Sequence, residues 1–368
     1  MSITVPPVLR EGNPASAQMD PAGIARAVDI VAETIAKGEI PGAVIAVARR
    51  GTLLLHQALG WAATQPEQRP MQLDTRFDLA SLTKVTATLP AVLHLLEQGA
   101  FRLDDRLQRF FPAFTGEGKE NVTVRHLLTH SAGLAPWLPL ELEPGTRSEY
   151  IQRILVAPLH QEPGKSIVYS DLGFILLGEL VHLLSGKPLD QYATAFIFRP
   201  NGLNSLGFNP APEVAATCAA TEYRPALGRY QVGEVHDERA TCLGGVAGHA
   251  GLFGTAVDIC AYGQLWLQGL LGPATLAAAT RMQAEDAGDS RGLGWIVLRP
   301  KHSFMSCGDL LTPGAFGHTG FTGTSLWNDP TTGLSVALLT NRVHFGRESD
   351  VILRLRPRFH NAIAAALR

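Results

Sequence analysis

The hydrophobic positions near the start of the chain follow two different periods. In residues 21–37 they recur every three to four positions, and this segment begins with a proline and is followed by a glycine, which predicts a helix. Residues 43–48 and 53–59 are short apolar runs on either side of a charged, glycine-containing turn, which predicts a β-hairpin. Residues 1–19, rich in proline and small side chains, are expected to form an extended tail.

Helical spacing dominates the middle of the chain, and strand-like runs return near its end. Turns rich in proline and glycine separate five predicted helices, which cover residues 83–98, 124–130, 149–156, 172–184 and 189–198. The predicted late strands cover residues 294–298, 314–318, 324–328 and 334–340, and the last two are expected to pair as a hairpin. A closing helix over residues 349–367 is expected to kink at Pro357, because proline lacks a backbone donor.

Two sheet-forming ends therefore bracket a helical middle. The simplest fold with this pattern is α+β: one antiparallel β-sheet flanked by the N- and C-terminal helices, with a mostly helical domain inserted. The expected division is the tail at 1–19, a sheet domain formed by 20–65 and 290–368, and a mostly helical domain over 66–289.

Composition and charge exclude several classes of protein. The chain has 368 residues, of which 46% are hydrophobic and 17% charged, as in ordinary globular proteins. A formal net charge of −2 gives no reason to expect nucleic acid or an anionic membrane surface as a partner. No apolar run has the length of a membrane-spanning helix, and the first twenty residues lack an apolar signal core. We therefore expect a cytoplasmic protein from the chain as given, or a periplasmic or secreted one if a signal peptide has been removed.

Cysteine and histidine spacing does not favour a metal site. The four cysteines, Cys218, Cys242, Cys260 and Cys307, form no C-x-x-C pair and lie among apolar residues, so we expect free, mostly buried thiols. His126 and His130 have the i, i+4 spacing of two ligands on one helix face, but leucine follows the first histidine where zinc proteases have glutamate. A helix cap and a core histidine are the expected roles, and no metal or organic cofactor is implied.

Ser81 and Lys84 form the first element of a possible catalytic site. Residues three apart share one face of a helix, so the two side chains are expected to lie close together. A serine hydroxyl becomes a nucleophile when a neighbouring base takes its proton, and a buried lysine whose pKa is lowered is suited to that role. A helix cap followed by a solvated lysine is the structural alternative.

Two further elements carry polar side chains that suit a cleft. Tyr169 precedes a predicted helix and is expected to point its phenol into the cleft, with a structural turn as the alternative. On a late predicted strand, His318, Thr319 and Gly320 form a glycine-containing edge that a substrate backbone is able to approach. The backbone N–H groups of Phe321 and Ser81 are then expected to stabilise an oxyanion.

Taken in this order, the three elements resemble the class C β-lactamase and D-alanyl-D-alanine peptidase family of penicillin-recognising serine hydrolases, which includes esterases. The resemblance covers about residues 20–365 and includes the segments 103–105, 127–133 and 244–251. It implies a sheet domain and a helical domain with the active site between them, and it implies no cofactor. Residues 244–251 are expected to form a turn that packs under the site.

The resemblance also implies roles for individual residues. Ser81 resembles the acylated nucleophile, Lys84 its partner, and Tyr169 the phenol that passes protons to the leaving group and later activates water. Asp171 stands where the family has an amide, and an ionised carboxylate only accepts hydrogen bonds. His318 stands where the family has lysine, so a fixed positive charge is weakened there. Both departures fit an esterase or peptidase at least as well as a β-lactamase.

The expected function is a serine hydrolase that acts through an acyl-enzyme on an amide or ester carbonyl of a small molecule or peptide. A carboxylesterase of the same fold is one alternative. A non-catalytic penicillin-sensing or binding module is another, although such a protein would be expected to have lost Ser81, Lys84 or Tyr169. The sequence indicates neither the acyl donor nor the oligomeric state.

Overall fold

The computed structural model describes residues 5–286, 288–299 and 306–368. Its largest element is a ten-stranded sheet with the order β1-β3-β2-β15-β14-β13-β12-β11-β10, and β4 pairs with β3 beside this path. Neighbouring strands are antiparallel except β1 and β3. The strands are β1 Arg10–Glu11, β2 Gly42–Arg49, β3 Thr52–Ala63, β4 Arg69–Pro70, β10 Ala284–Glu285, β11 Ser290–Arg291, β12 Ile296–Val297, β13 Phe316–Thr319, β14 Ser325–Asp329 and β15 Leu334–Thr340.

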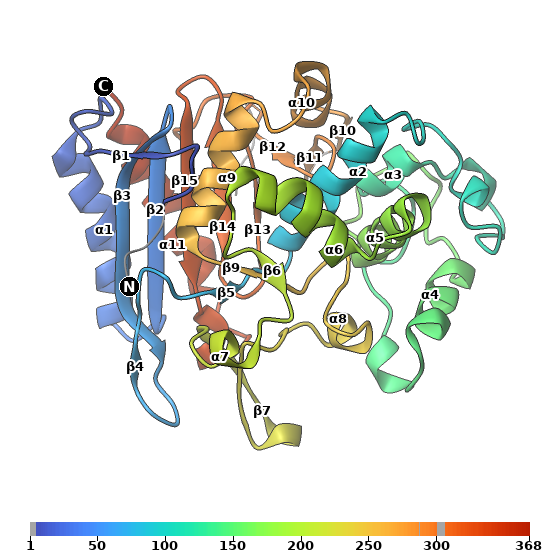
Figure 1. Cartoon of the computed structure of the whole chain (residues 1–368), viewed down its shortest axis with the longest axis horizontal. Coiled ribbons are helices and arrows are strands. Elements are labelled where there is room, and N and C mark those ends of the chain that lie inside the picture. Colours follow the sequence, from blue (N-terminus) through green and yellow to red (C-terminus); the bar gives the residue numbers. More distant parts are fainter. Residues whose placement is uncertain (1–4, 287, 300–305) are drawn as a thin grey trace.

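Helices cover both faces of this sheet (Figure 1). The terminal helices α1 (Pro21–Ala36) and α11 (Val351–Ala365) pack against each other on one face, whereas α9 (Ala256–Gln268) packs on β2, β14 and β15 from the other. β2 shows the consequence, because its successive side chains point to opposite faces. Ile45 belongs to the core under the terminal helices, and its neighbours Val44 and Ala46 belong to the core shared with the rest of the chain.

The mostly helical half of the molecule lies beside the sheet (Figure 1). Its central helix, α5 (Asp171–Ser185), is apolar on nearly all sides and largely buried, so other elements surround it. The remaining α-helices are α2 Leu89–Glu97, α3 Val124–Leu128, α4 Arg147–Val156, α6 Leu189–Ala193, α7 Pro212–Ala215, α8 Glu238–Cys242 and α10 Pro273–Thr280. Two small sheets complete this half, one formed by β5 (Phe77–Asp78), β9 (Leu252–Gly254) and β6 (Gly207–Phe208), the other by β7 (Ala220–Arg224) and β8 (Arg229–Val232).

Most of the predicted elements are confirmed, and three differ. The segment predicted as one helix over 83–98 begins with a π-helical turn, Lys84–Thr88, before α2. The segment over 189–198 is likewise split into α6 and a π-helical turn at Thr194–Phe198. The strand predicted over 294–298 is reduced to β12, while Pro357 does lie inside α11. The division of the chain at 65/66 and 289/290 stays a prediction, and α9, from the predicted helical part, packs on the sheet.

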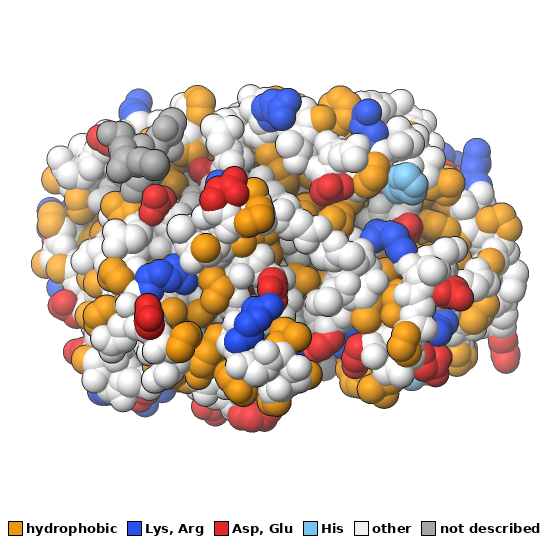
Figure 2. Space-filling model, turned by 60° about the horizontal axis from the view of Figure 1, so that its bottom comes forward, with side chains coloured by type: hydrophobic (Ala, Val, Ile, Leu, Met, Phe, Trp, Pro, Cys, Tyr) orange, Lys and Arg blue, Asp and Glu red, His pale blue; other side chains and the backbone are white. Residues whose placement is uncertain are grey.

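The surface and the thiols agree with the composition. On the face shown in Figure 2, acidic and basic side chains are interspersed. The four cysteines are free, and Cys242 is the one that is partly exposed. Within the described residues, no single helix is long and apolar enough to cross a membrane. A pair bent by 73°, Asp171–Ser185 with Leu189–Asn201, passes that test by length and composition only.

Candidate active site

Ser81 lies in the turn that joins β5 to the helical backbone before α2. The turn is tight because Ala80 adopts a left-handed conformation, with φ of 45°, which L-residues other than glycine rarely do. The backbone N–H of Ala80 donates a 2.8 Å hydrogen bond to Oδ1 of buried Asp78, and this bond holds the turn in place. Strained backbone of this kind is often found at functional positions.

The side chain of Lys84 is completely buried and joins three parts of the site. Its Nζ donates hydrogen bonds to Ser81 Oγ at 3.0 Å, to Asp171 Oδ1 at 2.7 Å and to the carbonyl of His249 at 3.2 Å. Burial lowers the pKa of Lys84, but the charges and hydrogen bonds of Asp171 and Tyr169 raise it by more, so the net pKa lies above its usual value. The lowered pKa that would suit Lys84 to take the Ser81 proton is therefore not found at this site.

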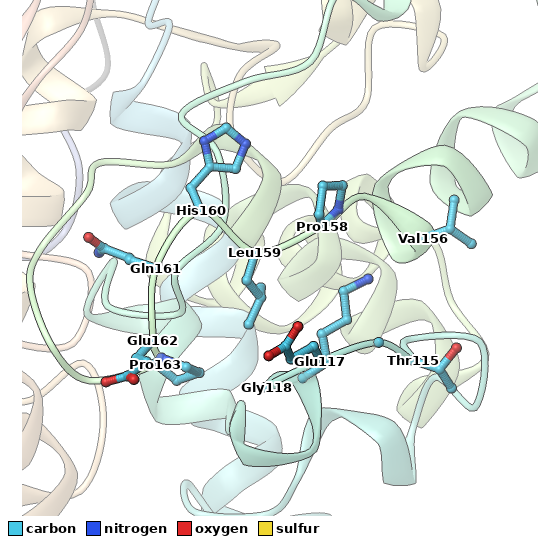
Figure 3. Close-up of a pocket in the computed structure, with 12 residues that line it drawn as sticks. Thr115, Glu117, Gly118, Val156, Pro158, Leu159, His160, Gln161, Glu162 and Pro163 are labelled. Carbon is cyan, nitrogen blue, oxygen red and sulfur yellow. The ribbon is translucent and has the colours of Figure 1, made fainter.

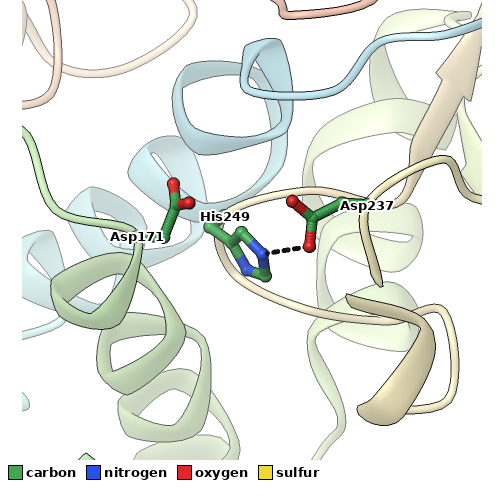
Figure 4. Close-up of side chains that lie close together, drawn as sticks. All are labelled: Asp171, Asp237 and His249. Atoms are coloured by element: carbon green, nitrogen blue, oxygen red, sulfur yellow. Dashed lines mark hydrogen bonds and ion pairs between the residues drawn. The ribbon is translucent and has the colours of Figure 1, made fainter. Parts of the chain in front are cut away.

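Asp171 begins α5 and belongs to a network of charges of alternating sign. Its Oδ2 lies 3.5 Å from the guanidinium of Arg239, which pairs with Asp237 at 2.8 Å, and Asp237 accepts a 3.0 Å hydrogen bond from His249 Nε2. Figure 4 shows the two carboxylates on either side of the His249 ring. Burial raises the pKa of Asp171, but the charges of Lys84 and His249 outweigh it, and the pKa lies below its usual value.

The ligand atoms of Asp171, Asp237 and His249 lie within 4.8 Å of one another, a spacing that suits a metal ion. Two cations already neutralise these carboxylates, since the Lys84 ammonium contacts one and the Arg239 guanidinium lies near both. A metal would have to displace one of them, so the chemistry of this donor set fits a charge-paired network better than a cation site.

Cations and rings surround Tyr169. Lys84 Nζ lies 4.7 Å from the centre of its ring, and the guanidinium carbon of Arg291 lies 5.4 Å from it. The rings of His130 and His318 stand at 4.6 and 5.9 Å from it. Negative charge that develops on this phenol therefore faces two positive groups.

His318, at the end of β13, is buried and neutral. Its Nδ1 donates a 2.8 Å hydrogen bond to the carbonyl of Thr319, and its Nε2 has no partner among the described residues. Burial, together with the charges of Arg291 and Lys84, holds the pKa of His318 well below its usual value. His318 therefore does not supply the fixed positive charge that lysine gives at this position in the family. Arg291, on the neighbouring part of the sheet at β11, lines the same cavity and carries a positive charge there.

The turn after β13 is tied to the segment that carries Ser81. The hydroxyls of Thr322 and Thr324 donate to the carbonyls of Asp78 and Leu79 at 2.7 and 3.0 Å. Gly320 allows this close approach, because a Cβ at that position would overlap the Leu79 carbonyl. This glycine therefore lets the turn that carries Ser81 pack against the strand, in addition to the role expected from its sequence.

The expected oxyanion donors lie at the same cavity. Within the described part of the chain, the backbone N–H groups of Ser81 and Phe321 donate to no protein atom. The Phe321 ring is half exposed and lies between His236 at 5.8 Å and the guanidinium of Arg342 at 4.8 Å. This cavity, of about 450 Å³, is lined by Ser81, Tyr169, Arg291, Ile296, His318, Thr319, Gly320, Phe321, Arg342, Ile352, Leu353 and Arg356.

A second cavity, of about 390 Å³, lies between the segments 115–119 and 156–163 (Figure 3). None of the site residues expected from the sequence lines it. The cavity at Ser81 is lined by six of those residues, so it is the candidate active site.

The structure brings all eight expected site residues to this region. Six of them line the cavity, whereas Lys84 lies behind Ser81, and Asp171 lies behind Lys84. The sequence reasoning missed Arg291, Asp237, Arg239 and His249. Residues 244–251 were predicted to pack under the site, and the carbonyls of Gly248 and His249 do accept hydrogen bonds from Thr88 and Lys84.

His126 and His130 have the roles expected for them. His126 accepts a hydrogen bond from the N–H of Thr123 in a capping box at the start of α3. His130 is buried and accepts the N–H of Ser170 at 3.0 Å, which fixes the backbone next to Tyr169.

Comparison with known proteins gives a consistent set of similarities. A family model described as Beta-lactamase matches residues 27–356. A protein of Escherichia coli (strain K12), provisionally named D-alanyl-D-alanine carboxypeptidase, is 34% identical over 304 residues, which make up 73% of this chain and 70% of that protein. A protein of the same name from Salmonella schwarzengrund (strain CVM19633) is 33% identical over 305 residues, 74% of this chain and 70% of its own.

Similar solved structures cover nearly the whole chain. EstCE1, a hydrolase with promiscuous acyltransferase activity, matches with a TM-score of 0.76 and 26% identity over 93% of this chain and 99% of its own. A penicillin-binding protein homologue from Caulobacter crescentus matches with a TM-score of 0.73 and 21% identity over 95% of this chain and 99% of its own, which shows a shared fold. The α+β fold class expected from the sequence is confirmed.

Proposed function

This chain belongs to the beta-lactamase family and is a serine hydrolase, and we propose that it is a penicillin-binding-protein-like carboxypeptidase that cleaves an amide or ester bond close to a free carboxylate. Ser81 is the nucleophile, and Lys84 and Tyr169 handle its proton. The observation that carries this proposal is the 3.0 Å hydrogen bond from buried Lys84 Nζ to Ser81 Oγ, directly beside Tyr169.

In the proposed reaction, Ser81 Oγ forms a bond to the carbonyl carbon as its proton moves to the Lys84–Tyr169 pair. The carbonyl π electrons move to the oxygen, which the N–H groups of Ser81 and Phe321 stabilise. When the tetrahedral intermediate collapses, the bond to the leaving group breaks and the leaving group takes the proton from Tyr169. A water molecule then attacks the carbonyl carbon of the acyl-enzyme with the same proton transfers, and the bond to Ser81 Oγ breaks to release the acid.

Arg291 supports a substrate that carries a carboxylate. Its Nε and Nη2 bind Asp289 at 2.8 and 2.6 Å, whereas its buried Nη1 has no partner among the described residues. An unpaired guanidinium N–H is costly in a buried site, and a substrate carboxylate would satisfy it. Peptides that end in D-alanine carry such a group, and this chain is 34% identical to a relative provisionally named as a carboxypeptidase for them.

Two features favour a peptidase or esterase over an efficient β-lactamase. Asp171 is an acceptor engaged by Lys84 and does not offer an amide N–H to a substrate side chain. His318 is neutral, so positive charge at the cavity is supplied from Arg291 at a different position.

A carboxylesterase is the second candidate, and the mouth of the cavity favours it. Phe321 and Leu353 line the cavity and are 49% and 71% exposed. Exposed apolar side chains at a cavity suit an apolar acyl group. EstCE1, at 26% identity, is described as a hydrolase with acyltransferase activity.

The test compares a depsipeptide that ends in a free carboxylate with its methyl ester, using the wild type and Ser81→Ala. The carboxypeptidase proposal predicts a kcat/KM at least about tenfold higher for the free acid, the effect of one charge-assisted hydrogen bond. Equal rates, or a preference for the methyl ester, would replace it with the esterase. Equal rates for wild type and Ser81→Ala would contradict both.

A further inference from the structure

The side chain that contacts Lys84 most closely is a carboxylate, although the family resemblance leads us to expect an amide there. Asp171 Oδ1 lies 2.7 Å from Lys84 Nζ, and the lysine is completely buried. An amide in the same place would accept the same hydrogen bond without a charge, whereas a carboxylate stabilises the ammonium form of its partner. The difference between aspartate and asparagine at this position is therefore electrostatic rather than steric.

The surrounding charges do not cancel this effect. Facing Lys84 are Tyr169 from the loop before α5, His130 from the loop after α3, His318 on β13, Arg291 on β11, and Asp237, Arg239 and His249 from the segment that leads to β9. His130 and His318 are buried, and their pKa values are held well below the usual range, so both remain neutral. Arg239 and Asp237 form a pair of opposite charge at 2.8 Å.

The network beyond Asp171 fixes the direction of its carboxylate. Arg239 lies 3.5 Å from Oδ2 of Asp171 and also contacts Asp237, which holds the imidazole of His249. The carbonyl of the same His249 accepts a hydrogen bond from Lys84. The network therefore closes a ring from Lys84 through Asp171, Arg239, Asp237 and His249 back to Lys84.

We propose that Asp171 is a positioning residue that holds Lys84 as an ammonium ion and thereby sets the pH above which Ser81 is activated; this inference rests on the proposed hydrolase function. The active form of the site has lost one proton from the Lys84–Tyr169 pair. Because Lys84 is held as ammonium, the atom that lacks the proton is the phenolate oxygen of Tyr169. The Ser81 proton moves to that oxygen as Oγ bonds to the carbonyl carbon, and the leaving group receives it when its own bond breaks.

The negative charge of Asp171 opposes loss of a proton from the Lys84–Tyr169 pair, and the positive charge of Arg239 favours it. Asp171→Asn keeps the shape of the side chain but removes the negative charge. It should therefore move the acid limb of the kcat/KM profile to lower pH, by roughly one to three units, the range that one close charge produces. Arg239→Gln removes a positive charge that offsets Asp171, and it should move the limb the other way.

The experiment records kcat/KM from pH 5 to 10 for an uncharged activated ester such as p-nitrophenyl acetate, with folding checked by circular dichroism. Asp104→Asn is the matched control, because Asp104 forms a comparable 2.7 Å ion pair with Arg125 away from the site, and its limb should coincide with that of the wild type. Opposite shifts in Asp171→Asn and Arg239→Gln are the expected result.

An unshifted limb in Asp171→Asn, or shifts of both variants in the same direction, would overturn the inference. If Asp171→Asn does not fold, Arg239→Gln decides, and an unshifted or lowered limb in that variant has the same meaning. A wild type no faster than Ser81→Ala at any pH would instead contradict the proposed hydrolase itself.

Discussion

Nζ of Lys84 donates a 3.0 Å hydrogen bond to Oγ of Ser81, three residues earlier in the chain. The contact forms where the turn that carries Ser81 enters the π-helical turn Lys84–Thr88, and Lys84 is wholly buried there. Its remaining hydrogen bonds go to Asp171 and to the carbonyl of His249, residues that lie 87 and 165 positions away. The local pair is thus held in place by distant parts of the chain.

Tyr169→Phe removes only the phenol oxygen, so the ring contacts with Lys84 and His130 should remain. Loss of a group that takes and returns a proton typically lowers the rate by about 10²–10⁴-fold. We expect a loss of that size in kcat/KM for an activated ester, with little change in thermal stability. A variant within threefold of the wild type would show that another group passes the proton.

Arg291→Gln tests recognition of a carboxylate. The variant keeps a polar side chain but removes the charge and the unpartnered Nη1. We expect kcat/KM for a depsipeptide with a free carboxylate to fall by roughly 10–100-fold, the value of a hydrogen bond to a charged group. The methyl ester of the same compound serves as the control and should be hydrolysed at nearly the wild-type rate. A parallel fall for both substrates would show that Arg291 supports the site structurally.

Gly248→Ala tests the turn under the site. A Cβ at Gly248 would overlap the carbonyl of Phe174, so the backbone that accepts hydrogen bonds from Thr88 and Lys84 must move. Overpacking of this kind costs about 1–3 kcal/mol. We expect a lower melting temperature together with a lower kcat. Gly207→Ala is the control, because a Cβ there meets no atom within 4 Å. Equal melting temperatures for the two variants would contradict the packing argument.

His360 on α11 makes stability depend on pH. Burial, with a contribution from Arg356, lowers the pKa of His360 from 6.5 to about 3. Between these values the unfolded chain binds a proton that the folded chain does not bind, so stability falls as the pH drops below 6.5. The slope for one such histidine is about 1.4 kcal/mol per pH unit. We expect His360→Leu to lose less stability than the wild type between pH 7 and pH 4.5 in urea unfolding. Identical losses would remove His360 as a cause.

The sequence was sufficient where the signal is local. The spacing of Ser81 and Lys84 predicted their contact, and the strands β2, β3, β14 and β15 were recognised from their short apolar runs. Helix α9 was missed because it is buried on most sides and shows no amphipathic stripe.

The remainder of the site depends on contacts between distant segments. Arg291 reaches the cavity through the pairing of β11, β12 and β13, 27 residues before His318, and no local pattern marks it. The direction of the Lys84 pKa shift could not be predicted from the sequence, because it depends on Asp171, whose distance from the lysine is set by the tertiary fold.

In the proposed reaction Ser81 carries the acyl group. The direct measurement is intact mass after an acid quench during turnover of p-nitrophenyl acetate, followed by peptide mapping, with Ser81→Ala treated in parallel. We expect an acetyl adduct on the wild type alone, located in the peptide that contains Ser81. An adduct of equal amount on Ser81→Ala, or one mapped to another residue in a fully active wild type, would contradict it.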